Sequence, residues 1–322
     1  MSISIILQQM GVICILVLIG VYLYKKHIID DHNSQKLSAI VVDVCNPALI
    51  LASILSGNMT ATRSDLLIAI ALGAAFYLFL VILGILIPRI LRVAPDKRKF
   101  YNLITVYTNT GFLGLPIARA ILPDNSILYV IVINVFYSLL FYTHGMAVFH
   151  SGKDIMKNPA DKDNAQKKSK HPLLSVFNPG TVMAVLSLLV FWFDITLPPI
   201  VSNTIQYIGN ATVFLSMALL GVSIARSSFF KTFKDLKIWL YIILRMILVP
   251  IAIVLIMNLI GFDPAATLAL CLMAAVPAGS LPLITAEKMG LDTELLSSSI
   301  AMSTFISIFS ITAIMSVVSM II

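Results

Sequence analysis

Apolar residues form long runs along this chain of 322 residues, and short polar stretches separate them. Each run is close to the roughly 20 residues that a helix needs to cross a membrane, and strands of a membrane barrel would be about ten residues long with alternating polarity. The pattern predicts an all-α integral membrane protein with ten transmembrane helices, at residues 4–24, 38–57, 66–91, 99–121, 126–149, 173–193, 203–225, 237–260, 265–286 and 295–321.

Two of these runs are interrupted by glycine and proline. The first reads Asn109-Thr110-Gly111-Phe112-Leu113-Gly114-Leu115-Pro116, and the second reads Pro277-Ala278-Gly279-Ser280-Leu281-Pro282. Glycine adds backbone freedom, and proline lacks an amide hydrogen and clashes with the preceding turn. We therefore predict that Pro116 and Pro282 break their helices. The alternative is that both helices are only kinked, because glycine and proline are common in membrane spans.

The interruptions recur at a regular interval. Pro116 and Pro282 lie 282 − 116 = 166 positions apart, and Asn46 and Asn210 lie 210 − 46 = 164 apart. This spacing predicts a first five-helix repeat at residues 1–151 and a second at 172–322, joined by a flexible linker at 152–171. Because five is an odd number, the second repeat enters the membrane in the opposite sense. Paired interrupted helices in two such halves mark the substrate site of many secondary transporters.

Composition and charge place the chain in the membrane. Only 11% of the residues are charged and the mean hydropathy is +0.98, which excludes a soluble domain. Nineteen lysines and arginines fall in the loops after odd-numbered helices, whereas only Arg63 and Arg119 fall on the other side. The positive-inside rule then predicts a multi-pass protein of the plasma (inner) membrane with both termini outside. The net charge of +7 follows from this distribution, so we expect no nucleic-acid partner.

A broken helix offers a site for an anion. The first turn after each break leaves amide hydrogens unpaired and carries about half a positive charge, so two such ends can hold a carboxylate without a buried lysine. The candidate substrate-binding residues at the breaks are Asn109, Thr110, Gly111, Phe112, Leu113, Gly114, Pro277, Ala278, Gly279 and Ser280. Asn46, Tyr137 and Ser303 are further candidates, although packing between helices is the alternative role for such residues.

Two charged residues lie inside predicted spans. Asp43 and Arg245 both enter the membrane from the predicted cytoplasmic side, and charge at membrane depth is costly enough to suggest function. We interpret Asp43 as a protonatable coupling or gating group that Arg245 engages in one conformation. Snorkelling, or a static ion pair between the two residues, is the alternative.

The broken segments resemble a known family. The string from Asn109 to Pro116 is similar to a signature of the auxin efflux carrier family, which includes bacterial malate and malonate permease-like proteins and plant PIN carriers. Asn46-Pro47-Ala48-Leu49 and the segment from Pro277 to Pro282 resemble its other marks. The resemblance implies an inverted-repeat fold like that of NhaA-type antiporters and bile-acid symporters. It also implies a scaffold of helices 1, 2, 6 and 7, a transport bundle of helices 3–5 and 8–10, crossed helices 4 and 9, and a homodimer through the scaffold.

The function we expect is secondary transport of small organic anions, auxin-like or malate-like carboxylates, by an elevator mechanism. Proton or sodium coupling is open, and a sodium-coupled symporter of the same fold, an ion channel and an intramembrane enzyme are the alternatives. No ATP-binding loop and no metal-ligand spacing occur in the sequence. We therefore expect no catalytic residue, metal or cofactor.

Overall fold

The protein is all-helical in the computed structural model, which describes residues 3–55, 60–151, 178–226, 236–289 and 291–321. The predicted linker at 152–171 lies outside these residues. The α-helices are α1 Ile3–Lys25, α2 Asp31–Ile40, α3 Asn46–Leu55, α4 Arg63–Ile90, α5 Arg98–Val106, α6 Leu115–Ile121, α7 Asp124–Leu140, α8 Met146–His150, α10 Pro179–Trp192, α11 Pro199–Arg226, α13 Leu236–Ile242, α14 Val249–Ile260, α15 Pro264–Ala275, α16 Leu281–Lys288 and α17 Glu294–Ile321. Wider π-helical turns are η1 Val41–Cys45, η2 Thr110–Gly114, η3 Phe141–Gly145 and η6 Ile243–Leu248.

Most of the predicted spans are continuous helices. Seven helical stretches of the described residues are long and apolar enough to cross a membrane, at Ile6–Lys25, His32–Leu55, Arg63–Ile90, Asp124–His150, Pro199–Arg226, Leu236–Ile260 and Glu294–Ile321. Shorter apolar helices occupy Thr110–Ile121, Pro179–Trp192 and Pro264–Ala275. These three fall within the remaining predicted spans, two of which contain the predicted breaks. The chain is thus a multi-pass membrane protein.

Three of the π-helical turns end two residues before a proline. Cys45, Gly114 and Leu248 are the last residues of η1, η2 and η6, and Pro47, Pro116 and Pro250 follow. Proline cannot donate to the carbonyl one turn back, and its ring crowds that carbonyl. A widened turn relieves this clash while the helix continues. Of the two prolines that we predicted to break helices, Pro116 therefore follows a widened first turn after its break, whereas Pro282 is the second residue of the regular helix α16.

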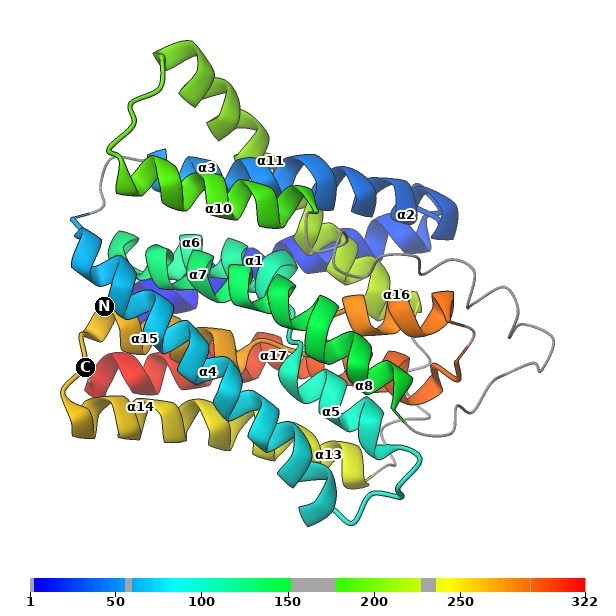
Figure 1. Ribbon diagram of the computed structural model, residues 1–322. Coiled ribbons are helices and arrows are strands. Elements are labelled where there is room, and N and C mark those ends of the chain that lie inside the picture. Colours follow the sequence, from blue (N-terminus) through cyan, green and yellow to red (C-terminus); the bar gives the residue numbers. More distant parts are fainter. Residues whose placement is uncertain (1–2, 56–59, 152–177, 227–235, 290, 322) are drawn as a thin grey trace.

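The helices form two groups. In Figure 1, α3, α10 and α11 lie together on one side of the molecule, whereas α4, α5, α13 and α14 lie on the other, with α7, α15 and α17 between. Within the first group α11 packs against both α1 and α3, and α10 packs against α3. Within the second, α4 packs against α5 and α7, and α15 packs against α7, α14 and α17.

Glycines bring the first group into backbone contact. Gly20 of α1 and Gly221 of α11 face each other, and a Cβ on either residue would overlap the other helix's backbone at Ala218 or Val17. Gly209 of α11 likewise lies against the backbone of Leu49, 2.9 Å from where its Cβ would be. Close approach through small residues is how membrane helices gain packing energy, because lipid provides no hydrophobic drive between them.

Candidate functional site: the crossing of two broken helices

The two interrupted segments meet and pair with each other. Helix α5 ends at Val106 and α15 ends at Ala275, and non-helical backbone follows each. Thr108 and Ala278 form an antiparallel β-bridge. The Asn109 amide donates to the Pro277 carbonyl at 2.8 Å, and the Gly279 amide donates to the Tyr107 carbonyl at 2.9 Å. Residues 168 to 172 positions apart in the chain thus satisfy part of the hydrogen bonding that the breaks removed.

The start of the first half-helix keeps free amide hydrogens. The amides of Leu113 and Gly114 donate to the Asn109 carbonyl. No acceptor for the amides of Gly111 or Phe112 lies among the described residues. These orphan donors and the positive helix end favour an anion.

Amide side chains from two other helices converge on this turn. Asn134 of α7 donates to the Val130 carbonyl, and its Oδ1 accepts from the Thr110 hydroxyl at 3.1 Å. A Cβ on Gly111 would lie 3.2 Å from Oδ1 of Asn134 and 3.4 Å from Nδ2 of Asn46. Gly111 therefore leaves room for both amides. The Oδ1 atom of Asn46 is buried and has no hydrogen-bond partner among the described residues.

The second break is held by α17. The Ser303 hydroxyl accepts from the Ala278 amide at 3.3 Å and donates to the Ile300 carbonyl at 3.0 Å. A Cβ on Gly279 would lie 3.0 Å from the Tyr107 carbonyl oxygen, so glycine allows the two segments of the crossing to pack closely. Pro277 and Ala278 are buried and Ser280 is exposed.

An aromatic cluster fixes the first break against α7. The Tyr107 hydroxyl donates to the Leu140 carbonyl at 2.8 Å and lies 2.8 Å from Nδ1 of His144. Leu140 immediately precedes η3, whose widened turn leaves this carbonyl available. The Tyr107 ring packs edge-on against Tyr137, with centroids 5.7 Å apart, and against Phe141 at 5.0 Å. Tyr137 therefore contacts the crossing through this ring.

A buried cation joins the ends of the two half-helices. Arg245 of η6 is 1% exposed. Its Nε donates to the Thr105 carbonyl at 2.9 Å, and its Nη1 donates to the Ala274 carbonyl. Thr105 and Ala274 are the penultimate residues of α5 and α15, so these carbonyls belong to the negative ends of both helices. The Nη2 atom is buried and has no partner among the described residues.

Asp43 lies elsewhere in this conformation. It belongs to η1, its side chain is exposed, and the helix that contains it begins at Asp31, several residues before the predicted start at 38. No ion pair joins Asp43 to Arg245, whose hydrogen bonds go to backbone carbonyls. A static pair and a snorkelling Arg245 are therefore both absent here. The gating role of these residues stays a prediction.

The structure brings most of the sequence candidates to the crossing and adds others. Asn46 and Ser303 lie at the crossing, as do Asn109–Gly114 and Pro277–Gly279, with Leu113 and Gly114 buried and Phe112 partly buried. Asn134 and Tyr107 were not selected from the sequence. A polar amide inside an apolar span was the available signal for Asn134, as it was for Asn46. Tyr107 gave no comparable signal, because buried tyrosines are common.

The comparisons with known proteins agree with a transporter. A family model described as membrane transport protein, the auxin efflux carrier family of the predicted resemblance, matches residues 5–315. An uncharacterized transporter of Methanocaldococcus jannaschii is 26% identical over 309 residues, covering 92% of this chain and 94% of that protein. An uncharacterized transporter of Methanothermobacter thermautotrophicus is 25% identical over 313 residues, covering 93% and 94% respectively. The chain therefore belongs to the membrane transport protein family.

Proposed function

We propose that this protein is a secondary transporter of a small organic anion, a carboxylate, which binds at the crossing of the broken helices. The main support for this proposal is the positive charge at the crossing, which has no carboxylate partner among the described residues. Unpaired amides begin the half-helix at Gly111, and a buried guanidinium binds the ends of α5 and α15, yet no carboxylate among the described residues pairs with Arg245. A buried positive site without its own counter-charge favours an anionic ligand.

The proposed substrate site is built around Gly111. The amides of Gly111 and Phe112 supply backbone donors, and the Asn46 amide lies beside them. A carboxylate could accept from these groups, while Thr110 is held in place by Asn134. On the second segment, the Ser280 amide also has no acceptor among the described residues. We propose Asn109, Leu113, Gly114, Pro277, Ala278, Gly279, Tyr137 and Ser303 as residues that shape or support this site.

We also propose that the chain consists of two inverted five-helix repeats. The helix contacts support this arrangement, because four of the main contacts between helices pair up when the spans of one half are exchanged for those of the other. The α1–α11 contact corresponds to α10–α3, and α4–α5 corresponds to α14–α15. Likewise α7–α15 corresponds to α17–α5, and α1–α17 corresponds to α10–α7. The antiparallel bridge at the crossing agrees with halves that run in opposite senses.

An elevator mechanism is consistent with the division of the helices into two separately packed groups. The scaffold would comprise α1–α3, α10 and α11, where backbones touch at glycine. The bundle would comprise α4–α8 and α13–α17, which contains both broken helices and Arg245. Because the crossing is hydrogen-bonded within the bundle, it can move as one body past the scaffold, and Asn46 would be the scaffold residue that the bound anion meets.

We also propose that transport is coupled to protons rather than to sodium ions. In sodium-coupled transporters of related design, carbonyls at half-helix ends coordinate the ion. Here the Arg245 guanidinium already occupies such carbonyls. Asp43 would then carry the coupled proton, so Asp43→Asn should bind substrate but lose any pH dependence of transport. A wild-type rate and pH profile in Asp43→Asn would contradict that role.

The test is a binding screen on the purified protein. Melting temperatures are measured with mono- and dicarboxylates, at several pH values, with sodium or choline as the cation at constant ionic strength. We expect at least one carboxylate to raise the melting temperature in wild type and in a Gly11→Leu control, whose site has no atom within 4 Å of the added Cβ, but not in Gly111→Leu. Stabilisation by cationic solutes alone would contradict an anion site. Sodium-dependent stabilisation would favour the symporter, and non-saturating flux in vesicles would favour a channel.

A further inference from the structure

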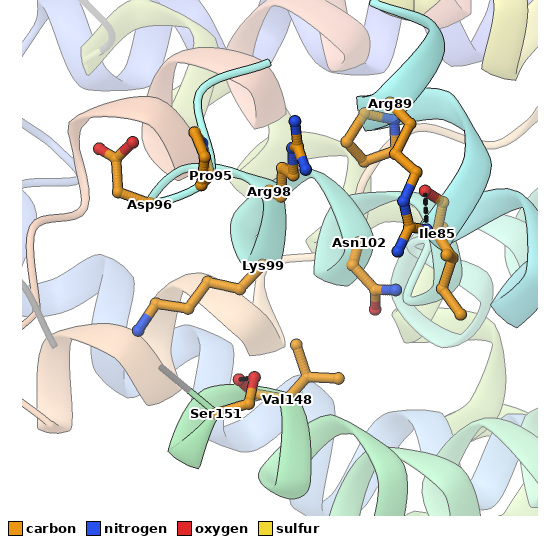
Figure 2. Close-up of a pocket in the computed structure, with 11 residues that line it drawn as sticks. Ile85, Arg89, Pro95, Asp96, Arg98, Lys99, Asn102, Val148 and Ser151 are labelled. Atoms are coloured by element: carbon orange, nitrogen blue, oxygen red, sulfur yellow. Dashed lines mark hydrogen bonds between the residues drawn. The ribbon is translucent and has the colours of Figure 1, made fainter. Parts of the chain in front are cut away.

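A basic pocket lies at one end of the proposed bundle, away from the crossing. It has a volume of about 550 Å³ and opens between the last turn of α4, the first turn of α5 and α8. Figure 2 shows Arg89, Arg98 and Lys99 around it, with Asn102 beside Arg89 and with Val148 and Ser151 on the side of α8. Asp96 is the carboxylate that lines it.

Two of the positive charges around the pocket lie at the positive end of the α5 helix dipole. Arg98 and Lys99 lie in the first turn of α5, which has no acidic residue and no side-chain cap. A cation such as Arg98 at this positive end is unfavourable unless an anion joins it. Backbone carbonyls orient two of the guanidinium groups, since Arg89 donates from Nη1 to Ile85 and Arg98 donates from Nε to Val93, each at 2.9 Å. Their other nitrogens have no acceptor among the described residues.

Asn102 adds a buried acceptor. It is 8% exposed, and its Oδ1 atom has no hydrogen-bond partner among the described residues. Gly84 of α4 makes room for this amide, because a Cβ there would lie 2.8 Å from Nδ2. An unsatisfied buried oxygen is costly, so a ligand that fits this pocket carries a hydrogen-bond donor as well as negative charge.

The position of the pocket points to the membrane surface. Helix α4 has 28 residues, which corresponds to about 42 Å at 1.5 Å per residue and matches the bilayer with its headgroups. Arg89 in its last turn is therefore at headgroup depth. Ile85 lines the pocket and is 44% exposed, and Ile82, Leu86 and Ile90 continue the same exposed apolar face. That face offers acyl chains a path from the pocket into the lipid.

We propose that this pocket binds the headgroup of an anionic phospholipid that bears a hydroxyl, as phosphatidylglycerol does. The phosphate lies between Arg89, Arg98 and Lys99, where guanidinium groups suit it in charge and geometry. A headgroup hydroxyl donates to Oδ1 of Asn102. The bound lipid joins α4, α5 and α8, so it travels with the bundle and stabilises it.

Native mass spectrometry of the detergent-purified chain tests this proposal. Palmitoyl-oleoyl phosphatidylglycerol or phosphatidylcholine is titrated into wild type, Arg89→Gln/Lys99→Gln and the control Lys25→Gln/Lys26→Gln, whose two exposed lysines end α1. We expect wild type and control to retain a phosphatidylglycerol that survives activation. The pocket variant should bind it about 25-fold more weakly, or about fivefold for each cation. Equal retention in the pocket variant, or equal binding of phosphatidylcholine by wild type, would overturn the site.

Two further arms separate the contributing groups. Asn102→Leu should weaken phosphatidylglycerol binding and leave phosphatidylmethanol binding unchanged, because the headgroup of phosphatidylmethanol has no hydroxyl. Equal loss of both would overturn the hydroxyl contact. Inorganic phosphate at millimolar concentration should not displace the lipid, and full displacement would assign the site to a soluble phosphate. If the glutamine variant fails to fold, Arg89→Lys/Lys99→Arg takes its place. This variant keeps both positive charges, so it should bind phosphatidylglycerol.

Discussion

At the scale of single residues, Arg245 is the most informative side chain. A buried charge in a membrane protein is costly unless it has partners. Here the partners are carbonyls of Thr105 and Ala274, which lie 140 and 29 positions away in the chain and end two different helices. A cation fixed to the chain thus lies at helix ends of the kind that bind a mobile ion in other transporters. Its Nη2 atom has no partner among the described residues and adds positive potential at these helix ends.

Replacing Arg245 with methionine should abolish transport and lower the stability. Two carbonyls lose a charged donor, and the helix ends that meet there lose their cation, so we expect a cost of about 2–4 kcal/mol. Arg245→Lys should keep part of the transport activity and part of the stability. Its ammonium group keeps the positive charge but lacks the planar guanidinium that donates to two carbonyls at once. Arg119→Met is the control, because Arg119 makes a partly exposed ion pair with Asp124, and such pairs are worth about 0–1 kcal/mol.

Melting temperature and substrate uptake in vesicles provide the two readouts. Wild-type uptake by Arg245→Met, with a melting temperature no lower than that of Arg119→Met, would contradict the role of the guanidinium at the crossing.

At the scale of elements, the crossing depends on glycine and proline for different reasons. Gly279 permits the second segment to lie against the first, where backbone atoms of Tyr107 and Thr108 would contact any Cβ at 3.0–3.2 Å. Pro116 instead sets the wide turn that opens the half-helix after the first break. Glycine therefore controls the pairing of the two segments, whereas proline controls the shape of the helix start.

Gly279→Leu should separate the paired segments and abolish transport. The side chain would meet backbone oxygens, which cannot move aside as a flexible side chain would, so both bridge hydrogen bonds should weaken. Amide hydrogen exchange should then become faster at Asn109 and at position 279, whose amides make the two bridge hydrogen bonds. Gly11→Leu in α1 should leave exchange and uptake unchanged, since its Cβ position is open. Slow exchange at Asn109 in Gly279→Leu would mean that the bridge tolerates the side chain.

Pro116→Ala and Pro282→Ala should also abolish transport while the protein remains folded in the membrane. Alanine restores an amide donor and lets the helix approach regular geometry, so the orphan amides at the break find partners. Uptake in vesicles, with size-exclusion chromatography as the check on folding, tests both variants. Near wild-type uptake in both would show that the breaks are dispensable.

The sequence was sufficient to identify a multi-pass helical membrane protein and to locate the two breaks, because length, hydropathy, glycine and proline act locally. It was insufficient for the contacts that join distant segments. Nothing local indicates that Thr108 pairs with Ala278, or that Arg245 binds backbone carbonyls instead of Asp43. Backbone acceptors carry no residue identity, so a search for a carboxylate partner could not find them. Asn134 was visible as a polar residue, but its contact with Thr110 required the fold.

At the scale of the whole molecule, the proposed orientation rests on the charge distribution along the chain. A cysteine placed at residues 152–170 should be protected from impermeant thiol reagents in intact cells, and a cysteine added after Ile322 should react. The reason is that basic loops stay on the cytoplasmic side. Cells permeabilised with detergent are the control, because both sites should then react. Labelling of the 152–170 site alone in intact cells would reverse the orientation.

The proposed movement of bundle against scaffold can be tested at a contact between the two groups. Arg63 at the start of α4 pairs with Asp194, just after α10, at 3.1 Å, and its guanidinium lies 5.7 Å from the centre of the Trp192 ring. Both side chains are largely exposed, at 58% and 83%. The ion pair itself is therefore worth about 0–1 kcal/mol, and it can break and re-form as the bundle moves.

Tying this contact covalently should stop transport. Arg63→Cys and Asp194→Cys are introduced after Cys14, Cys45 and Cys271 are replaced by alanine, and a short bis-maleimide then joins α4 to the end of α10. Before cross-linking, uptake should stay near wild type, because a weak surface ion pair is all that is lost. Afterwards uptake should cease, since the scaffold and the bundle can no longer separate. The matched control joins Arg119→Cys to Asp124→Cys, both within the proposed bundle, and should keep its activity. Continued uptake by the fully cross-linked 63–194 protein would mean that α4 and α10 do not move apart during transport, and an elevator displacement would then be ruled out for this pair of helices.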